Sequence, residues 1–211
     1  MCRLLCVKSE KPFPIADFLQ PFAEMSRKSK EYQGDGWGYA IHDRSGWRLY
    51  HCVDPIWEDD LSVKVNTTML IAHARSAFGG SPVAVEYNMP YTDGRSVFVF
   101  NGELRGVRIQ SEGRIGAEKI FSLIRSYDKG DTRSALELAM TVLEKRSTYI
   151  KAANIIMSDG PSILAASRFN EDDEYYTLWK STDNETMVIA SEPIDNNKTW
   201  QPIPQGVHRI A

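Results

Sequence analysis

The sequence predicts an α+β fold in which helices are layered over two β-sheets. Short apolar runs of strand length, separated by turn signals, occupy both ends of the 211-residue chain. Between them, two segments repeat apolar residues at helical spacing, and a third helical pattern lies near the start. Because each apolar face must be buried against another layer, strands followed by two helices and more strands indicate helices packed on sheets.

Several segments have the length and composition of strands. They are residues 4–7, 37–43, 47–53, 68–74 and 96–100 in the first half, and 153–158, 162–169, 175–180 and 187–191 in the second. The segment DRSG at 43–46 separates two of them and signals a hairpin. The tail from Pro193 is rich in Pro, Asn and Gln, and we expect it to wrap the surface.

Three segments have the spacing of amphipathic helices. Residues 15–31 carry an apolar face that is interrupted near Pro21. Residues 117–127 and 132–146 each place apolar side chains on one face, and Asp131 is the expected N-cap of the second. The short KG link at 129–130 makes these two helices neighbours.

Composition excludes several classes of function. The chain has 25 Lys+Arg against 28 Asp+Glu, a formal net charge of -3, and ordinary fractions of hydrophobic (42%) and charged (25%) residues. The chain therefore lacks the excess of basic residues that is typical of nucleic-acid-binding proteins. No run approaches the roughly 18 consecutive apolar residues that are needed to span a bilayer. The N-terminus lacks the apolar stretch and cleavage site of a signal peptide. We therefore expect a cytoplasmic protein with neither nucleic-acid nor membrane partners.

The cysteines and histidines do not indicate a disulfide framework or a metal site. Cys2, Cys6 and Cys52 are odd in number and form no Cys-x-x-Cys motif. The four histidines are scattered, without the spacing of metal ligands. The sequence thus predicts no metal and no cofactor, and it fits a reducing compartment.

Cys2 is the residue best suited to act as a catalytic nucleophile. Removal of Met1 would leave Cys2 with a free α-amine beside its own thiol. A thiolate is a strong nucleophile that needs a base, and an α-amine titrates at about 7.7–8.0, which suits base catalysis near neutrality. Cys2 can therefore supply nucleophile and base together. The alternative is that Cys2 begins a buried strand, because cysteine often behaves as a small hydrophobic residue.

Three further segments contain groups that suit a small-molecule site. GDGWG at 34–38 permits close approach of backbone to a ligand, or is simply a turn. Arg75 ends an apolar strand, where its guanidinium can bind a carboxylate with two hydrogen bonds or lie on the surface. Asn101 and Gly102 end another strand. Their side-chain amide and backbone N–H can form an oxyanion hole, although Asn-Gly is also common in turns.

Together these segments resemble the class II glutamine amidotransferases of the N-terminal-nucleophile (Ntn) hydrolase superfamily. The matching order is MCRLL at 1–5, GDGWG at 34–38, AHARS at 72–76, PY at 90–91 and FVFNGE at 98–103. SDG at 158–160 and ASEP at 190–193 resemble the small stand-alone members, which include γ-glutamyl amide hydrolases of thiol metabolism. The similarity covers about residues 1–195 without a linker, so we expect a single domain, 1–211. The implied fold is a four-layer αββα sandwich of two antiparallel sheets between helical layers.

The resemblance implies catalytic roles for three residues. Cys2, freed of Met1, would be the nucleophile and its α-amine the base, while Asn101 and Gly102 would hold the oxyanion. Cys2 would attack a γ-amide, ammonia or an amine would leave, and water would cleave the γ-glutamyl thioester.

The resemblance also implies substrate-binding residues. Arg75 would bind the α-carboxylate of a glutamine-like substrate. Gly36 and Trp37 would shape the pocket, and His73 would contribute to the same site.

Two positions depart from the family pattern. The Asp that binds the substrate's α-amine in the family lies two residues before the Glu at the start of a helix, and here Gly116 stands two residues before Glu118. The family's His-Pro is MP at 89–90. Glu86 and Glu112 are candidates for replacing the missing acid. Loss of this charged contact argues against free L-glutamine as the optimal substrate.

Three interpretations of function are open at this point. The first is an amidohydrolase or glutaminase that acts alone or as a homo-oligomer on a small γ-glutamyl substrate. The second is a glutaminase subunit that delivers ammonia to a partner synthase, and an exposed apolar patch near residues 34–38 would favour it. The third is a catalytically degenerate binding protein, which Gly116 and a retained Met1 would favour.

Overall fold

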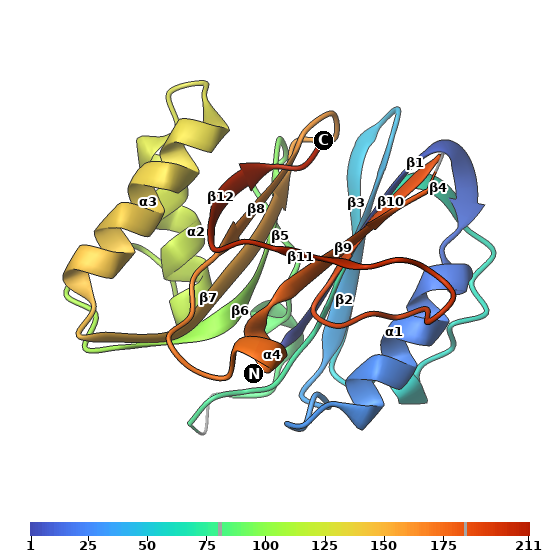
Figure 1. The fold of residues 1–211 in the computed structure, drawn as a ribbon, viewed down its shortest axis with the longest axis horizontal. Helices are drawn as coiled ribbons and strands as arrows, with labels where there is room; N and C mark the ends of the chain where they lie inside the picture. Colours follow the sequence, from blue (N-terminus) through green and yellow to red (C-terminus); the bar gives the residue numbers. More distant parts are fainter. Residues whose placement is uncertain (80–81, 184) are drawn as a thin grey trace.

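The computed structural model describes residues 1–79, 82–183 and 185–211. Two antiparallel sheets face each other, and helices cover the outer face of each sheet (Figure 1). The layers therefore follow the order helix, sheet, sheet, helix that the family resemblance implies. Within the described ranges, no helix combines the length and apolar composition needed to cross a membrane.

The larger sheet has seven strands in the order β11-β9-β10-β1-β4-β2-β3. They are β1 (Arg3–Pro14), β2 (Trp37–Asp43), β3 (Gly46–Cys52), β4 (Asn66–Ala74), β9 (Leu178–Thr182), β10 (Thr186–Ala190) and β11 (Gln201–Ile203). Successive side chains of a strand point to opposite faces. Leu5 and Val7 accordingly pack with helix α1 (Ala16–Lys28), whereas Leu4 and Cys6 pack toward the second sheet.

The smaller sheet has five strands in the order β12-β8-β7-β6-β5. They are β5 (Tyr91–Thr92), β6 (Val97–Arg105), β7 (Tyr149–Ser158), β8 (Ile163–Ser167) and β12 (Gly206–Arg209). Helices α2 (Gly116–Tyr127) and α3 (Thr132–Arg146) cover its outer face, as Figure 1 shows. Phe98 of β6 stacks on Phe121 of α2 with ring centroids 5.1 Å apart. The short elements are α4 (Asp173–Tyr176) and the 3-10 turns η1 (Ile56–Glu58) and η2 (Val85–Tyr87).

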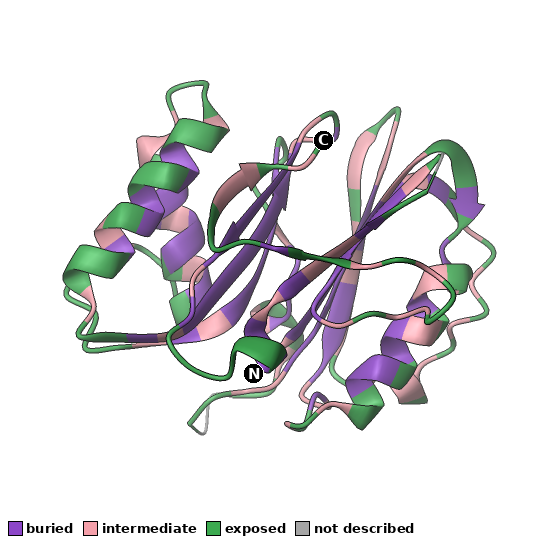
Figure 2. Cartoon of the chain, viewed as in Figure 1, coloured by how far each residue is buried: buried purple, intermediate pink, exposed green. Residues whose placement is uncertain are grey.

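Buried residues concentrate on the surfaces where the layers meet, and the helices are buried along one side (Figure 2). The start of α3 confirms the expected cap, because the Asp131 carboxylate accepts hydrogen bonds from the backbone N–H groups of Arg133 and Ser134. Helix α1 continues through Pro21, where the sequence predicted an interruption. Buried Leu19 and Phe22 flank this position and hold the helix on the sheet.

Three segments differ from the sequence-based expectation. Strand β1 extends to Pro14: it pairs with β10 as far as Ser9, and its pairing with β4 breaks after Lys8 and resumes at Phe13 and Pro14. Residues 175–180 are divided between α4 and β9, since Tyr175 and Tyr176 pack inward from a helical turn. The tail does more than wrap the surface: it adds β11 to one sheet and β12 to the other.

The strand register brings three of the predicted motifs to one end of the larger sheet. Arg3 of β1 and Trp37 of β2 both pair with Ala74 of β4. Cys2, Gly36 and Arg75 each lie one residue beyond these positions. The backbone N–H of Arg75 donates to the carbonyl of Gly36 at 2.8 Å, which ties the last two together.

Candidate active site

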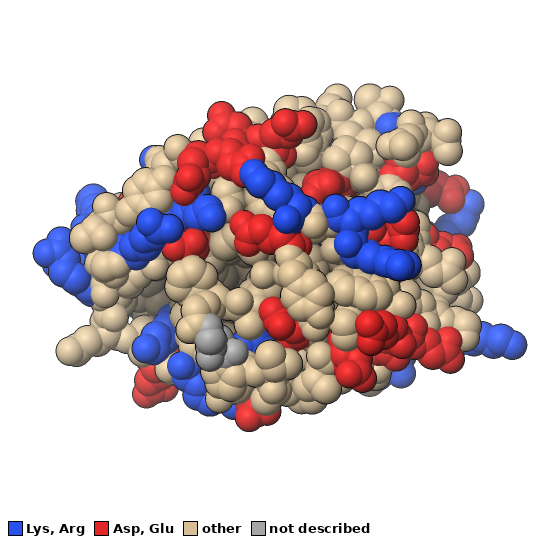
Figure 3. Space-filling model, turned by 90° about the horizontal axis from the view of Figure 1, so that it is seen from below, with Lys and Arg blue, Asp and Glu red and all other residues tan. Residues whose placement is uncertain are grey.

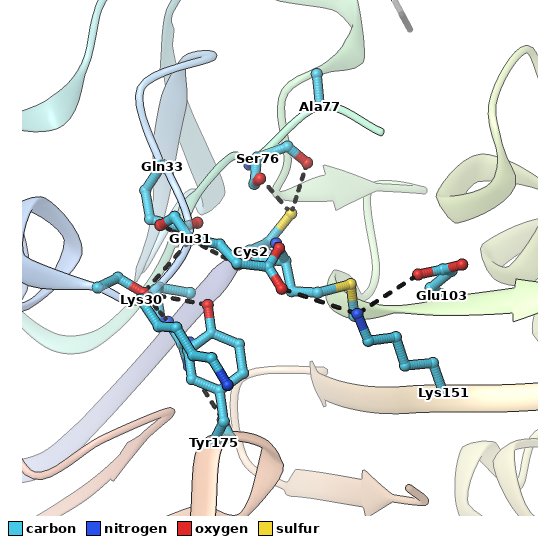
Figure 4. Close-up of polar contacts among 12 residues, drawn as sticks. Cys2, Lys30, Glu31, Gln33, Ser76, Ala77, Glu103, Lys151 and Tyr175 are labelled. Carbon is cyan, nitrogen blue, oxygen red and sulfur yellow. Dashed lines mark hydrogen bonds and ion pairs between the residues drawn. The ribbon is translucent and has the colours of Figure 1, made fainter. Parts of the chain in front are cut away.

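Cys2 directly precedes β1, and its thiol lies on the side of the larger sheet that faces the smaller sheet. Its Sγ accepts a hydrogen bond from the backbone N–H of Ser76 at 3.4 Å and lies 3.6 Å from the Ser76 carbonyl oxygen (Figure 4). Burial raises the pKa of the Cys2 thiol, although the Ser76 N–H, the N-terminal ammonium and Arg75 oppose this shift. The resting sulfur is therefore a neutral thiol, which needs a base before it can attack.

Cys2 lines a cavity of about 420 Å³ between the ends of the two sheets and helix α2. Its wall is formed by residues 75–77 on one side, by the second half of β6 on another and by the first two turns of α2. This volume lies within the range of roughly 300–1,000 Å³ that small-molecule sites occupy. Acidic and basic side chains are mixed over the face of the molecule seen from below in Figure 3.

Arg75 lines the cavity with a buried guanidinium that is 4% exposed. Its Nη2 donates to the carbonyl of Pro82 at 2.9 Å and its Nη1 to that of Asp35 at 3.5 Å. Among the residues described, no carboxylate lies within ion-pair distance of it. The nearby Asp35 carboxylate instead accepts from the backbone N–H of Ala77 at 2.7 Å. The guanidinium also lies over the Tyr87 ring, 5.7 Å from its centroid. A buried cation that is bound by carbonyl groups and a ring, without a carboxylate among the described residues, is a suitable receptor for an anionic ligand.

Asn101 is 1% exposed, and neither atom of its side-chain amide has a hydrogen-bond partner within the described part of the chain. Most buried amides are hydrogen-bonded, so such a group is a candidate for contact with a ligand, although Asn101 itself does not line the cavity. The neighbouring Gly102 lines the cavity. A Cβ at Gly102 would lie 2.3 Å from the Ala152 carbonyl oxygen, so the backbone here can approach β7 only without a side chain.

Gly36 and Trp37 do not line the cavity. Gly36 has a φ of 107°, and a Cβ there would lie 2.2 Å from the Asn88 side chain, so this position requires glycine. Trp37 is buried in the core beneath helix α1, and its Nε1 donates to the Asp59 carboxylate at 2.9 Å. Neither residue forms part of the cavity wall, in contrast to the expectation that they shape the pocket, and Gly36 contacts Arg75 through its backbone carbonyl.

His73 is fully buried between the sheets and does not line the cavity. Neither of its ring nitrogens has a partner among the described residues. Burial, with smaller contributions from Arg75 and His51, lowers the pKa of His73 to about 3. His73 is thus neutral near pH 7 and sits beside the site without reaching it.

This lowered pKa predicts a pH-dependent stability. Between pH 6.5 and 3 the unfolded chain binds a proton that folded His73 excludes, so stability is complete above about pH 6.5 and falls as pH decreases. The expected loss from this group is about 3 kcal/mol between pH 7 and pH 4. Urea unfolding of wild type, His73→Gln and the surface control His208→Gln at both pH values checks this. An unchanged pH slope in His73→Gln would contradict it.

The N-terminal residue has a polar and an apolar set of contacts. The Met1 ammonium pairs with Glu31, and Gln33 Nε2 donates to the Met1 carbonyl at 2.6 Å (Figure 4). The Met1 side chain packs against Ala152, Phe169, Tyr175 and Tyr176. With Met1 in place, the nitrogen of Cys2 is a peptide nitrogen and cannot act as a base.

Sequence reasoning missed three charged residues around this terminus. Lys151 Nζ lies 3.9 Å from Glu31 and 3.9 Å from Glu103 (Figure 4). The Glu103 carboxylate also accepts from Arg105 Nε at 2.7 Å. These residues come from separate segments of the sequence. Of the three, only Glu103 belongs to a motif recognised in the sequence, FVFNGE at 98–103. Glu86 and Glu112, the expected substitutes for the missing acid, are exposed and do not line the cavity. Gly116 does line it.

Comparisons with known proteins concern the fold and the relatives of this chain. No family model matches the chain. The Escherichia coli protein named as glutamine amidotransferase YafJ is 23% identical over 253 residues, covering 100% of this chain and 97% of the relative. The γ-glutamyl-hercynylcysteine sulfoxide hydrolase of Mycolicibacterium smegmatis is 26% identical over 206 residues, covering 90% of this chain and 83% of the relative. A glutamine aminotransferase class-II domain protein from Silicibacter pomeroyi has a TM-score of 0.68 at 17% identity, covering 99% of this chain and 98% of that one.

The fold is therefore that of the Ntn-type α+β sandwich, and the predicted fold class is confirmed. Within that class, the relatives also confirm the resemblance of this chain to the small class II glutamine amidotransferases.

Proposed function

We propose that the chain hydrolyses the γ-amide of glutamine or of a γ-glutamyl compound through a thioester on an N-terminal Cys2. The observation that carries this proposal is that one cavity is lined by the Cys2 thiol, by Gly102 and by a buried guanidinium that has no carboxylate partner among the described residues. The names of the relatives, an amidotransferase and γ-glutamyl hydrolases, support the same reaction class.

In the proposed first step, removal of Met1 frees the α-amine of Cys2 to accept the thiol proton. The sulfur attacks the γ-carbonyl carbon, and the carbonyl oxygen becomes an oxyanion held by Asn101 Nδ2 and the Gly102 N–H. The ammonium returns its proton to the leaving nitrogen, the C–N bond breaks, and a γ-glutamyl thioester remains.

In the second step, a water molecule replaces the departed amine. The α-amine of Cys2 takes a proton from this water as its oxygen attacks the thioester carbon. The C–S bond then breaks, the sulfur recovers its proton, and the γ-carboxylic acid is released. Arg75 holds the α-carboxylate of the substrate throughout, which fixes the distance between the γ-carbonyl and the nucleophile.

Arg75→Gln tests the substrate orientation in this proposal. We expect kcat/KM for γ-glutamyl p-nitroanilide to fall by about 10- to 100-fold, mainly through KM, because a charged hydrogen-bonded contact contributes about 1.5–3 kcal/mol. The analogue without the α-carboxylate should be hydrolysed equally by wild type and variant. A thermal melt controls for the loss of a buried side chain. Equal losses on both substrates would contradict the assignment.

A further inference from the structure

The cavity beside Cys2 continues into an apolar region beneath helices α2 and α3. We call this region the apolar seat. It is lined by Leu104, Ile109, Ala117, Ile120, Leu123 and Leu143. Its four helical residues are buried. Three of them belong to α2, whereas Leu143, which is 2% exposed, belongs to α3. A small polar amino acid bound at Cys2 and Arg75 would leave this surface uncovered, whereas an apolar substituent would bury it.

The charges around the cavity disfavour a free ammonium group. Arg75, Arg114 and Lys119 line it, whereas Glu103 is the one lining carboxylate among the described residues. That carboxylate is already paired with Arg105 at 2.7 Å and lies 3.9 Å from Lys151. A substrate ammonium in the cavity would therefore lie near other cations and near a carboxylate that is already paired. It would lose its hydration without gaining an ion-pair partner.

Gly116, the first residue of α2, lines the same cavity and leaves open space beside it. A Cβ built there meets nothing within 4 Å, so the glycine is required neither by packing nor by a left-handed backbone. The neighbouring acidic side chain, Glu118, is held by Arg114, which also donates to the Glu86 carbonyl at 2.8 Å. The cavity wall at Gly116 thus has space for a substituent but supplies no unpaired carboxylate.

We propose that the preferred substrate is a carboxylate-bearing γ-amide whose α-nitrogen is acylated and uncharged, with an apolar acyl group in the apolar seat. This inference rests on the proposed function and deepens it. Arg75 would bind the carboxylate, and the acyl amide would pass the open space at Gly116. The reaction is unchanged: water replaces the amine at the γ-carbonyl, and the acyl group stays on the α-nitrogen.

The test compares γ-glutamyl p-nitroanilide with its N-acetyl and N-hexanoyl derivatives, which share one leaving group. We expect kcat/KM to be at least 10-fold higher for the N-hexanoyl compound than for the free amine, with the N-acetyl compound between them. Gly116→Asp, which the open space accommodates, should raise activity on the free amine by at least 10-fold and lower it on the acylated compounds. Gly116→Asn has the same shape without charge and should give no gain on the free amine.

Binding to a Cys2→Ala variant separates this inference from the proposed function. N-hexanoylglutamine should bind at least 10-fold more tightly than glutamine in calorimetry, whether or not the wild type hydrolyses either. Equal or reversed preference, in hydrolysis or in binding, overturns the inference even if hydrolysis depends on Cys2. Preferential binding of the acylated ligand without any Cys2-dependent hydrolysis supports the inference and overturns the proposed reaction.

Discussion

Replacing Cys2 with alanine is expected to reduce kcat for γ-glutamyl amide hydrolysis by about 1,000-fold or more, because no thioester can form without the nucleophile. Binding of the intact amide should change little, since Arg75 and the cavity wall remain in place. Stopped assays of kcat with calorimetric Kd values separate the two effects.

The matched control for this prediction is Cys52→Ser. Cys52 is a partly exposed thiol on β3 that does not line the cavity, so its replacement should leave kcat unchanged. Cys6 is less suitable because it is fully buried in the core, where burial raises its pKa to about 12. Residual turnover in Cys2→Ala close to the wild-type rate would reject the thioester mechanism.

Replacing Asn101 with alanine is expected to lower kcat by about 100- to 1,000-fold with little change in KM, because the amide would donate to an oxyanion that exists only after attack. Its side chain has no hydrogen-bond partner within the described chain, so its removal breaks no internal hydrogen bond. Urea unfolding should therefore show a smaller loss of stability than is usual for a buried polar residue.

Asn154 provides the matched control, because it pairs directly with Asn101 across β6 and β7. Its Nδ2 donates to the Tyr176 carbonyl at 2.6 Å, and its Oδ1 accepts from Ser167 at 2.8 Å. Asn154→Ala should cost about 1–3 kcal/mol of stability by leaving buried partners unsatisfied. A result in which Asn101→Ala destabilises the fold as much as Asn154→Ala, with kcat unchanged, would contradict an oxyanion role.

The sequence was most informative where an apolar pattern coincides with a single element. Residues 37–43 form β2 with the expected bounds, and α2 and α3 begin within one residue of expectation. Apolar periodicity could not detect the polar half of β1, because this half is held in the sheet by backbone pairing of Ser9 with β10 and of Phe13 and Pro14 with β4. It also missed β11 and β12, which depend on sheet edges formed by distant segments.

The candidate site was predicted in part. Cys2, Arg75 and Gly102 line one cavity, as the spacing of the motifs and the family resemblance suggested. Trp37 instead packs beneath α1, because alternation along β2 turns its side chain away from the second sheet. Glu31 and Lys151 had no sequence signal, since only the folded chain brings them to the N-terminus.

The most direct measurement is the intact mass of the protein, purified from the cells that make it, after reaction with a glutamine-like electrophile. We expect the polypeptide mass to be lower by one methionine residue than that of the full sequence, with a single adduct per chain on Cys2. Peptide mapping would place the label, and free Cys52 in the same sample serves as the internal control. Retention of Met1 with no adduct on Cys2 would contradict an N-terminal nucleophile and favour the binding-protein interpretation.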